Sequence, residues 1–199
     1  MLEILKLGEG FAVLNKPSGL LSIPGRTIHD SVASRVPWIV PGAHGPIVAH
    51  RLDQDTSGVM VVGLTPADHR ALSIAFANGH VAKRYVARLG EDPSEESGTI
   101  ELALRADLDD RPRQVVHPRG KRSLTRWRRL GARRIALVPE QGRTHQLRVH
   151  LSSGLGLPID GDRLYGGAVA SRLMLHATHL EFPHPRTGSP VAVSSAPPF

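Results

Sequence analysis

Apolar and polar positions along the chain predict many short strands and few helices. Continuous apolar stretches at 11–14 and 59–64 are typical of buried strands, and residues 81–89 alternate like a half-buried strand. Further short strands are expected at 135–138, 173–182 and 191–193. This pattern favours an α+β fold with a mostly antiparallel sheet.

One helix is clearly marked at both ends. Thr65 suits an N-cap, Pro66 suits the first helical position, and Asn78 followed by Gly79 suits a C-terminus. A second, shorter helix is expected over 142–151.

The stretch between the first two predicted strands is rich in Pro, Gly and His over residues 24–46. We interpret it as a long surface connection. In the second predicted helix, Leu147 and Leu151 would face the core.

The chain length and composition predict one domain over residues 1–199. No linker divides the sequence, and 199 residues are enough for a sizeable core. The sequence contains no cysteine, which excludes disulfides, thiolate metal sites and cysteine nucleophiles. No apolar run approaches the roughly 20 residues that a membrane helix needs. We expect a soluble, cytoplasmic protein.

Positive charge is concentrated in one segment. The formal net charge is +7, and residues 111–134 contain ten cations and no acid. These cations are Arg111, Arg113, Arg119, Lys121, Arg122, Arg126, Arg128, Arg129, Arg133 and Arg134. They would repel one another, and a polyanion would relieve that repulsion. The segment therefore favours a nucleic-acid footprint over a solvated basic face.

The candidate chemistry lies at 50–65, where Asp53 follows Arg51 and precedes a Thr-Ser-Gly turn. In an extended backbone, Arg51 and Asp53 would share one face. A nearby guanidinium stabilises the charge of a carboxylate. An ionised aspartate is suited to nucleophilic attack or to accepting a proton.

Asp53 and Asp55 also allow two other hypotheses. A D-x-D pair can bind Mg²⁺ in nucleases or transferases, and two carboxylates can hydrolyse glycosides. Acids are common in turns, no third acid is nearby, and the basic segment favours a polyanion over a sugar. We interpret Asp55 as a turn residue.

The eleven histidines do not form a convincing metal motif. His176 and His179 would lie on opposite faces of the strand predicted at 173–182, and no H-E-x-x-H pattern occurs. No metal site is expected. Tyr85, between Arg84 and Arg88, is equally consistent with a core aromatic and with a ring that stacks on an extruded base.

Six segments, taken in order, resemble the RluA-type pseudouridine synthases over nearly the whole chain. They are 15–19 (NKPSG), 50–53 (HRLD) with 56–58 (TSG), 83–87 (KRYVA), 142–150 (GRTHQLRVH), 158–166 (PIDGDRLYG) and 173–177 (LMLHA). The resemblance implies a mixed, mostly antiparallel sheet that is split by a central RNA-binding cleft. It also implies conversion of a chosen uridine in RNA to pseudouridine, without a metal or organic cofactor.

The resemblance assigns roles to four residues. Asp53 matches the catalytic aspartate, and Tyr85 matches the tyrosine that stacks on the target base. Arg148 matches the basic residue that pairs with the aspartate, and Arg51 an arginine near the flipped nucleotide. Three roles stay open for Asp53: attack on the sugar, attack on the base, or removal of the C2′ proton.

Relatives often carry an N-terminal RNA-binding domain of the S4 type, which we do not expect here because the catalytic motifs begin close to Met1. Target choice would then depend on the catalytic domain and its basic segment. We expect a stem-loop of rRNA, tRNA or both as substrate, no DNA or membrane partner, and a monomer. The alternative is a catalytically silent, basic RNA-binding module.

Overall fold

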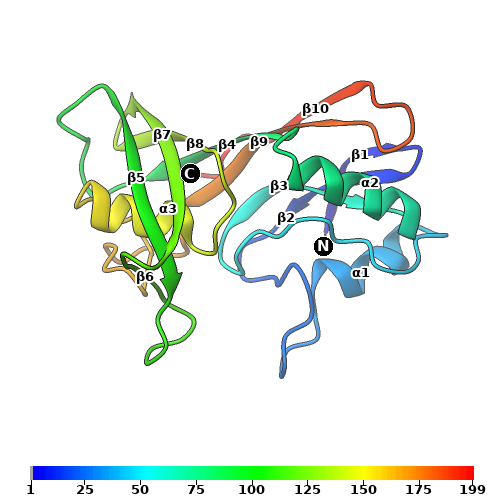
Figure 1. Cartoon of the computed structure of the whole chain (residues 1–199), viewed down its shortest axis with the longest axis horizontal. Coiled ribbons are helices and arrows are strands. Elements are labelled where there is room, and N and C mark those ends of the chain that lie inside the picture. Colours follow the sequence, from blue (N-terminus) through cyan, green and yellow to red (C-terminus); the bar gives the residue numbers. More distant parts are fainter. Residues whose placement is uncertain (1) are drawn as a thin grey trace. The chain divides into compact units, whose positions relative to one another are not determined.

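The structure, a computed structural model, describes residues 2–199 and contains two compact units (Figure 1). Unit 1 comprises the chain up to Lys83 together with His176–Pro198. Unit 2 comprises Arg84–Leu175 and the terminal Phe199. The residues singled out by the sequence are therefore divided between two bodies.

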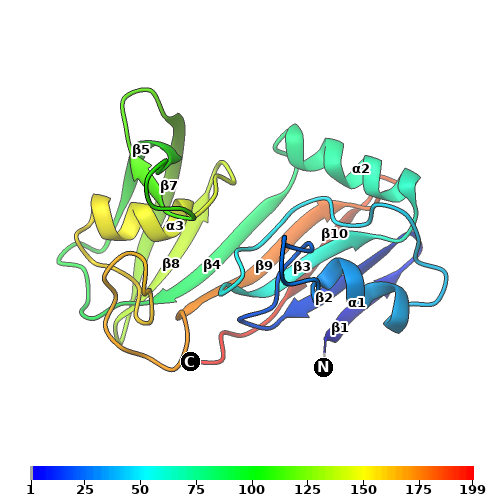
Figure 2. The same cartoon turned by 90° about the horizontal axis from the view of Figure 1, so that it is seen from below.

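The strands of unit 1 follow the order β1-β2-β3-β9, with β10 paired to β9. Their bounds are Glu3–Gly8 for β1, Phe11–Lys16 for β2, Ser57–Gly63 for β3, Leu175–Pro183 for β9 and Pro190–Ser194 for β10. Only β3 and β9 are parallel, and the other pairs are antiparallel. The order of the strands can be followed in Figure 2.

Helix α2 (Pro66–Ala77) has the ends that the sequence predicts. The hydroxyl of Thr65 accepts a hydrogen bond from the backbone N–H of Asp68, and Asn78 is the C-cap. Leu72 and Ala75 pack into the core of unit 1 with apolar side chains of β2 and β3. The helix thus covers the strand that follows Asp53.

The surface connection expected over 24–46 is a wrong prediction, because helix α1 (Val32–Ile39) lies within it. Ser31 and Ser34 form a capping box, and Val32 and Val36 are fully buried. Two features hide this helix in the sequence: it is only two turns long, and Pro37 lies inside it. Proline lacks the N–H that a helix interior uses, so it indicates a break.

The strands of unit 2 follow the order β4-β8-β7-β5-β6, and every pair is antiparallel. Their bounds are Ala82–Arg88 for β4, Ser97–Ala106 for β5, Gln114–Val116 for β6, Lys121–Gly131 for β7 and Arg134–Pro139 for β8. Strand β7 lies within the basic segment. Its buried positions include Ser123 and Thr125, which are polar, so no apolar alternation identifies this strand in the sequence.

The helix expected over 142–151 is only partly correct. His145 has a left-handed backbone (φ 53°), so helix α3 starts after it at Gln146 and extends to Val149. A π-helical turn, η1 (His150–Gly154), continues the segment. Leu147 and Leu151 do face the core, as predicted.

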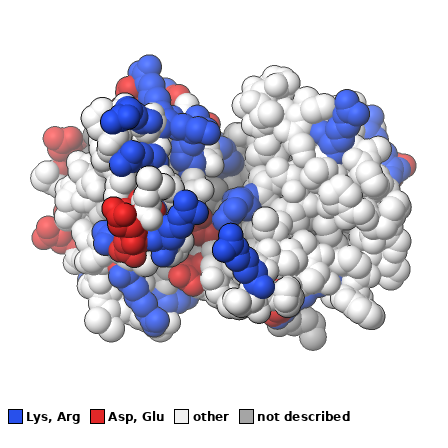
Figure 3. Space-filling view, turned by 60° about the horizontal axis from the view of Figure 1, so that its bottom comes forward, with Lys and Arg blue, Asp and Glu red and all other residues white. Residues whose placement is uncertain are grey.

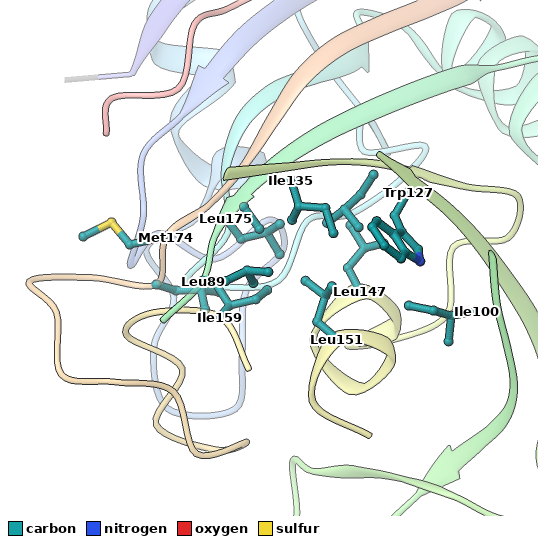
Figure 4. Close-up of a cluster of buried hydrophobic side chains, with 12 residues drawn as sticks. Leu89, Ile100, Trp127, Ile135, Leu147, Leu151, Ile159, Met174 and Leu175 are labelled. Atoms are coloured by element: carbon teal, nitrogen blue, oxygen red, sulfur yellow. The ribbon is translucent and has the colours of Figure 1, made fainter. Parts of the chain in front are cut away.

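The core of unit 2 surrounds this helical segment (Figure 4). Leu147 and Leu151 point from it towards side chains of β5, β7 and β8, among them Ile100, Trp127 and Ile135. The buried members of the cluster are Ala87, Leu89, Ile100, Trp127, Ile135, Leu137, Leu147, Leu151, Ile159, Leu173, Met174 and Leu175. This packing fixes the face of α3 from which Arg148 extends.

The predicted strands at 11–14, 59–64, 81–89, 135–138, 173–182 and 191–193 correspond to β2, β3, β4, β8, β9 and β10. The fold class is confirmed: few helices accompany mixed, mostly antiparallel strands. Within residues 2–199, no helix is both long and apolar enough to cross a membrane.

Candidate active site

Asp53 begins a turn that leads into β3 in unit 1. Its carbonyl accepts a hydrogen bond from the backbone N–H of Thr56 at 3.2 Å, and its side chain is half-buried. The preceding Leu52 is buried, and the Ser22 hydroxyl donates to its carbonyl (2.7 Å) and accepts from its N–H (3.1 Å). The backbone at Asp53 is therefore held from the interior, while its carboxylate stays accessible.

The ammonium of Lys16 holds the same turn from the other side. Lys16 lies at the end of β2 and is fully buried. Its Nζ donates to the carbonyls of Pro17 (3.0 Å), Leu20 (2.6 Å) and Gln54 (2.8 Å). The Gln54 carbonyl also accepts the N–H of Gly19 at 2.9 Å. Residue 54 follows Asp53 directly, so the 15–19 motif positions the catalytic candidate.

Lys16 is a functional residue for which the sequence motifs predicted no role. The available signal is a lysine at the end of an apolar strand and directly before a proline. A lysine there must either reach solvent or find several acceptors, because a buried charge is stable only when it is hydrogen-bonded.

The pairing expected between Arg51 and Asp53 is wrong. Arg51 is exposed, and no ion pair joins it to Asp53 in the part of the chain that the structure describes. Side chains two residues apart share a face only while the backbone is extended. Here the backbone enters a turn at Asp53, and Arg51 extends to solvent.

His50, the first residue of the same motif, is a structural histidine. Its Nε2 accepts the N–H of Val61 at 3.1 Å, and its ring stacks on Phe76 of α2 with centroids 4.2 Å apart. Burial, together with the nearby charge of Lys83, lowers the pKa of His50 to about 3. A neutral ring with an occupied nitrogen anchors the chain just before Arg51.

His176 and His179 are three residues apart on β9, which places their side chains on opposite faces of the strand, as predicted. His176 is buried, and its Nδ1 lies 2.7 Å from the Ser57 hydroxyl. His179 instead contacts the Ser194 hydroxyl on β10 at 2.8 Å. The two rings therefore have different neighbours, in agreement with the strand.

In unit 2, Arg148 of α3 forms a buried ion pair with Asp162. Its Nε donates to Oδ2 (2.8 Å) and its Nη2 to Oδ1 (2.7 Å), and both side chains are almost completely buried. Oδ1 also accepts the N–H groups of Leu164 (3.1 Å) and Tyr165 (3.2 Å). A two-pronged pair of this kind fixes the plane of the guanidinium as well as its position.

Tyr165 connects Arg148 to β6. The Arg148 guanidinium lies 5.1 Å from the centroid of the Tyr165 ring. The Tyr165 hydroxyl contacts His145 Nδ1 (2.8 Å) and accepts the N–H of Gln114 (2.8 Å). The sequence analysis placed Asp162 and Tyr165 in a family motif without giving either a role.

Tyr85 lies on β4 opposite Leu137 of β8, half-buried against the core of unit 2. Strand alternation places its neighbours Arg84 and Arg88 on the other face of the sheet. The ring is therefore supported by apolar packing and is not flanked by these two arginines. The interpretation as a core aromatic is confirmed by this packing, and stacking on an extruded base stays a prediction for the partly exposed ring.

The basic segment is less uniformly charged in space than in sequence. Four of its arginines pair with acids from other segments: Arg113 with Asp110, Arg122 with Glu101, Arg126 with Glu140, and Arg129 with Glu96. Figure 3 shows acidic side chains between the basic ones on the surface of unit 2. These ion pairs reduce the predicted mutual repulsion. The positive charge that is not neutralised belongs to the cations without acidic partners.

Replacing Lys16 with Met should destabilise the Asp53 turn. The change leaves three carbonyls without their donor, and each unsatisfied buried group costs about 1–3 kcal/mol. We expect a loss of about 3 kcal/mol in unfolding free energy by urea titration, and faster hydrogen exchange at the Gly19 amide. Lys6→Met, an exposed lysine of β1, serves as the control and should change stability by less than about 0.5 kcal/mol. Equal effects of the two substitutions would contradict the role of Lys16.

The pKa of His50 predicts a loss of stability in mild acid. Its folded-state pKa of about 3 is below the usual value of 6.5, so the unfolded chain binds one more proton between these values. Unfolding free energy should therefore fall as the pH drops from 6.5 towards 3. His50→Gln should reduce the slope by up to about 1.4 kcal/mol per pH unit, measured by urea unfolding across this range. An unchanged slope would show that His50 does not titrate in this way.

Comparisons with known proteins agree with these features. The sequence profile described as RNA pseudouridylate synthase matches residues 10–153. The dual-specificity RNA pseudouridine synthase RluA of Escherichia coli K12 is 41% identical over 210 residues, which span 100% of this chain and 94% of the relative. RluA of Yersinia pestis is 43% identical over 200 residues, spanning 94% of this chain and 95% of the relative.

A solved structure shows the same fold. Human RNA pseudouridylate synthase domain containing 1 superposes with a TM-score of 0.83 at 28% identity, spanning 100% of this chain and 84% of that chain. The motifs, the fold and these matches lead to one conclusion. The chain belongs to the RNA pseudouridylate synthase family and, within it, to the RluA type.

Proposed function

We propose that this RNA pseudouridine synthase isomerises selected uridines in stem-loops of rRNA, tRNA or both. The proposed reaction depends on nucleotide flipping and on Asp53, and it uses no metal or organic cofactor. One observation carries the proposal: Asp53 has a half-buried carboxylate on a turn that is held by two buried side chains, Lys16 and Ser22. Such a turn keeps a reactive group in place without covering it.

Flipping is required because a stacked uracil hides its glycosidic bond. Extrusion costs a few kcal/mol, and less in a loop, which favours loop targets. We propose that Tyr85 recovers part of this cost by stacking on the base. Its ring is already positioned by packing against the core of unit 2, so little further ordering would be needed.

The isomerisation breaks the N1–C1′ bond, rotates the base and joins C5 to C1′; finally C5 loses its proton and N1 gains one through exchange with solvent. Every atom of the uridine is retained except for exchange of that proton, so no oxidant or group donor is required. Asp53 would start the sequence in one of three ways: attack on the sugar, attack on the base, or removal of the C2′ proton. All three need an ionised carboxylate.

Arg148 is proposed to stabilise the charge of Asp53 when substrate is bound. Its guanidinium is already oriented by Asp162 and lies against Tyr165, so its position and plane are defined before substrate binds. Preoriented donors of this kind are the most effective electrostatic catalysts. Arg51, exposed and without an acidic partner among residues 2–199, suits a phosphate near the flipped nucleotide.

We propose a single catalytic domain over residues 1–199 that acts as a monomer in the cytoplasm, without a DNA or membrane partner. Target choice would depend on this domain and on the surface of its basic segment.

Asp53→Asn should bind RNA and form no pseudouridine, because an amide can neither attack nor accept a proton as the carboxylate does. Pseudouridine-specific chemical mapping of total RNA would compare cells with and without the gene, rescued by each variant. Sites lost in the deletion should return with wild type and stay absent with Asp53→Asn. The neighbouring, exposed Asp55→Asn is the control and should restore them.

Two outcomes would contradict this proposal in different ways. Rescue by Asp53→Asn would remove the aspartate from the reaction. A deletion that changes no pseudouridine site would favour the silent RNA-binding module instead.

Arg148→Lys should lower the rate constant about 100-fold or more while changing RNA affinity less than about 10-fold, because lysine keeps the charge but loses the oriented fork. Single-turnover kinetics on the mapped RNA would measure both quantities. Arg88→Lys is a matched control in the same unit, since Arg88 Nε donates to Asp160 at 2.8 Å. Equal rates for the two variants would refute a role for Arg148 beyond structure.

A further inference from the structure

A pocket of about 450 Å³ on unit 2 is lined by β5, β6, the turn before β7 and the loop before α3. Its polar lining consists of Arg105, Gln114, Arg119, Lys121, Arg143 and Thr144. No acidic residue lines it. The pocket thus combines four cations with neutral hydrogen-bonding groups.

These four cations differ from four arginines of the basic segment that have acidic partners. Arg113, Arg122, Arg126 and Arg129 are each neutralised by an acid. In the part of the chain that the structure describes, no acid pairs with any cation of the pocket, and all four are exposed. Acidic side chains therefore neutralise several arginines near the pocket, while the cations that line it keep their positive charge.

The turn before β7 gives the pocket a firm wall. The N–H of Gly120 donates to the His117 carbonyl (2.8 Å), and the N–H of Arg119 donates to His117 Nδ1 (3.0 Å). A Cβ at Gly120 would lie 2.6 Å from the backbone nitrogen of Leu104, so only glycine allows the turn to approach β5 this closely. Arg119 and Lys121 flank this glycine and are held by its geometry.

The opposite wall is also fixed. The N–H of Arg143 donates to Gln146 Oε1 at 3.1 Å. The amide of the buried Gln146 in turn donates to the carbonyl of Leu124 and to the hydroxyl of Thr125, both at 3.1 Å. The first wall is joined to β5 by the N–H of His117, which donates to the carbonyl of Ala103 at 2.9 Å, so hydrogen bonds connect both walls to the body of unit 2.

The pocket adjoins the Arg148 site through two residues. Gln114 lines the pocket, and its backbone N–H donates to the Tyr165 hydroxyl. Tyr165 in turn carries the Arg148 guanidinium over its ring. A group bound in the pocket would therefore lie in a fixed relation to Arg148.

We propose that this pocket binds one backbone phosphate of the substrate RNA and so sets the register of the strand relative to Arg148. The proposal rests on the proposed function, because it takes RNA as the ligand. Cations without counter-ions favour a phosphodiester, and phosphate contacts fix position without reading bases. The pocket should therefore control substrate affinity and leave the chemical step unchanged.

The first test replaces both turn cations, Arg119→Gln with Lys121→Gln. The matched control is Arg128→Gln with Arg134→Gln, which removes the same charge from exposed, unpaired positions outside the pocket. RNA affinity is measured in the Asp53→Asn background over a range of salt concentrations, with the mapped stem-loop as probe. We expect the pocket variant to lose about 10-fold to 100-fold in affinity and the magnitude of its salt slope to fall by about 1. In the active background, KM should rise while kcat stays within about twofold.

The second test locates the phosphate. Single neutral methylphosphonates are introduced along the stem-loop, and binding is measured for wild type and for the pocket variant. One position should weaken binding to wild type and to the control variant while leaving the pocket variant unaffected, because its partner cations are already absent.

Two results would overturn the proposal: equal affinity losses for the pocket and control variants, or no methylphosphonate position whose effect depends on the pocket. Either result would show that the basic segment attracts RNA by its overall positive charge and does not bind one particular phosphate. Wild-type turnover keeps the two claims separate. No pseudouridine formation by the wild type overturns the proposed function, whereas normal turnover with indistinguishable variants overturns the pocket alone.

Discussion

The buried ammonium of Lys16 is the interaction on which the Asp53 turn depends. A charged group inside a protein is tolerated only when hydrogen bonds replace its hydration, and three carbonyls do so here. One of them belongs to Gln54, so satisfying the lysine also fixes the residue next to Asp53. The hydrogen bonds that stabilise the buried charge therefore also hold the catalytic candidate in a defined position. They start from Lys16, which is fully buried at the end of β2.

Unit 2 follows the same rule with a different pair of charges. Asp162 is buried, yet it accepts two hydrogen bonds from Arg148 and two from backbone N–H groups. In both units the supporting groups are buried and saturated. The residues proposed to meet the RNA, Asp53 and Tyr85, are only half-buried. Precise placement and access are thus supplied by different side chains, as the proposed reaction on a flipped nucleotide would require.

Ion pairs with acidic side chains reduce the positive charge on the surface of unit 2. The sequence contains a nearly continuous run of cations, but acids from other strands and loops neutralise part of it in the folded chain. The cations without acidic partners among the described residues include those of a positive pocket, which is framed by two hydrogen-bonded walls. A local focus of this kind positions an RNA strand better than a uniform field does, since a uniform field attracts without choosing a register.

The sequence by itself determined the apolar strands, the capped helix α2, the family and Asp53 as the catalytic candidate, because periodicity, caps and motifs are local signals. Tertiary structure alone decided what those residues contact. It revealed α1 despite Pro37, the polar-cored strand β7, and the turn that separates Arg51 from Asp53. It also supplied partners distant in sequence, such as Gln54 for Lys16 and Asp162 for Arg148. These pairings depend on how strands align and how loops close, and neither can be predicted from a local sequence pattern.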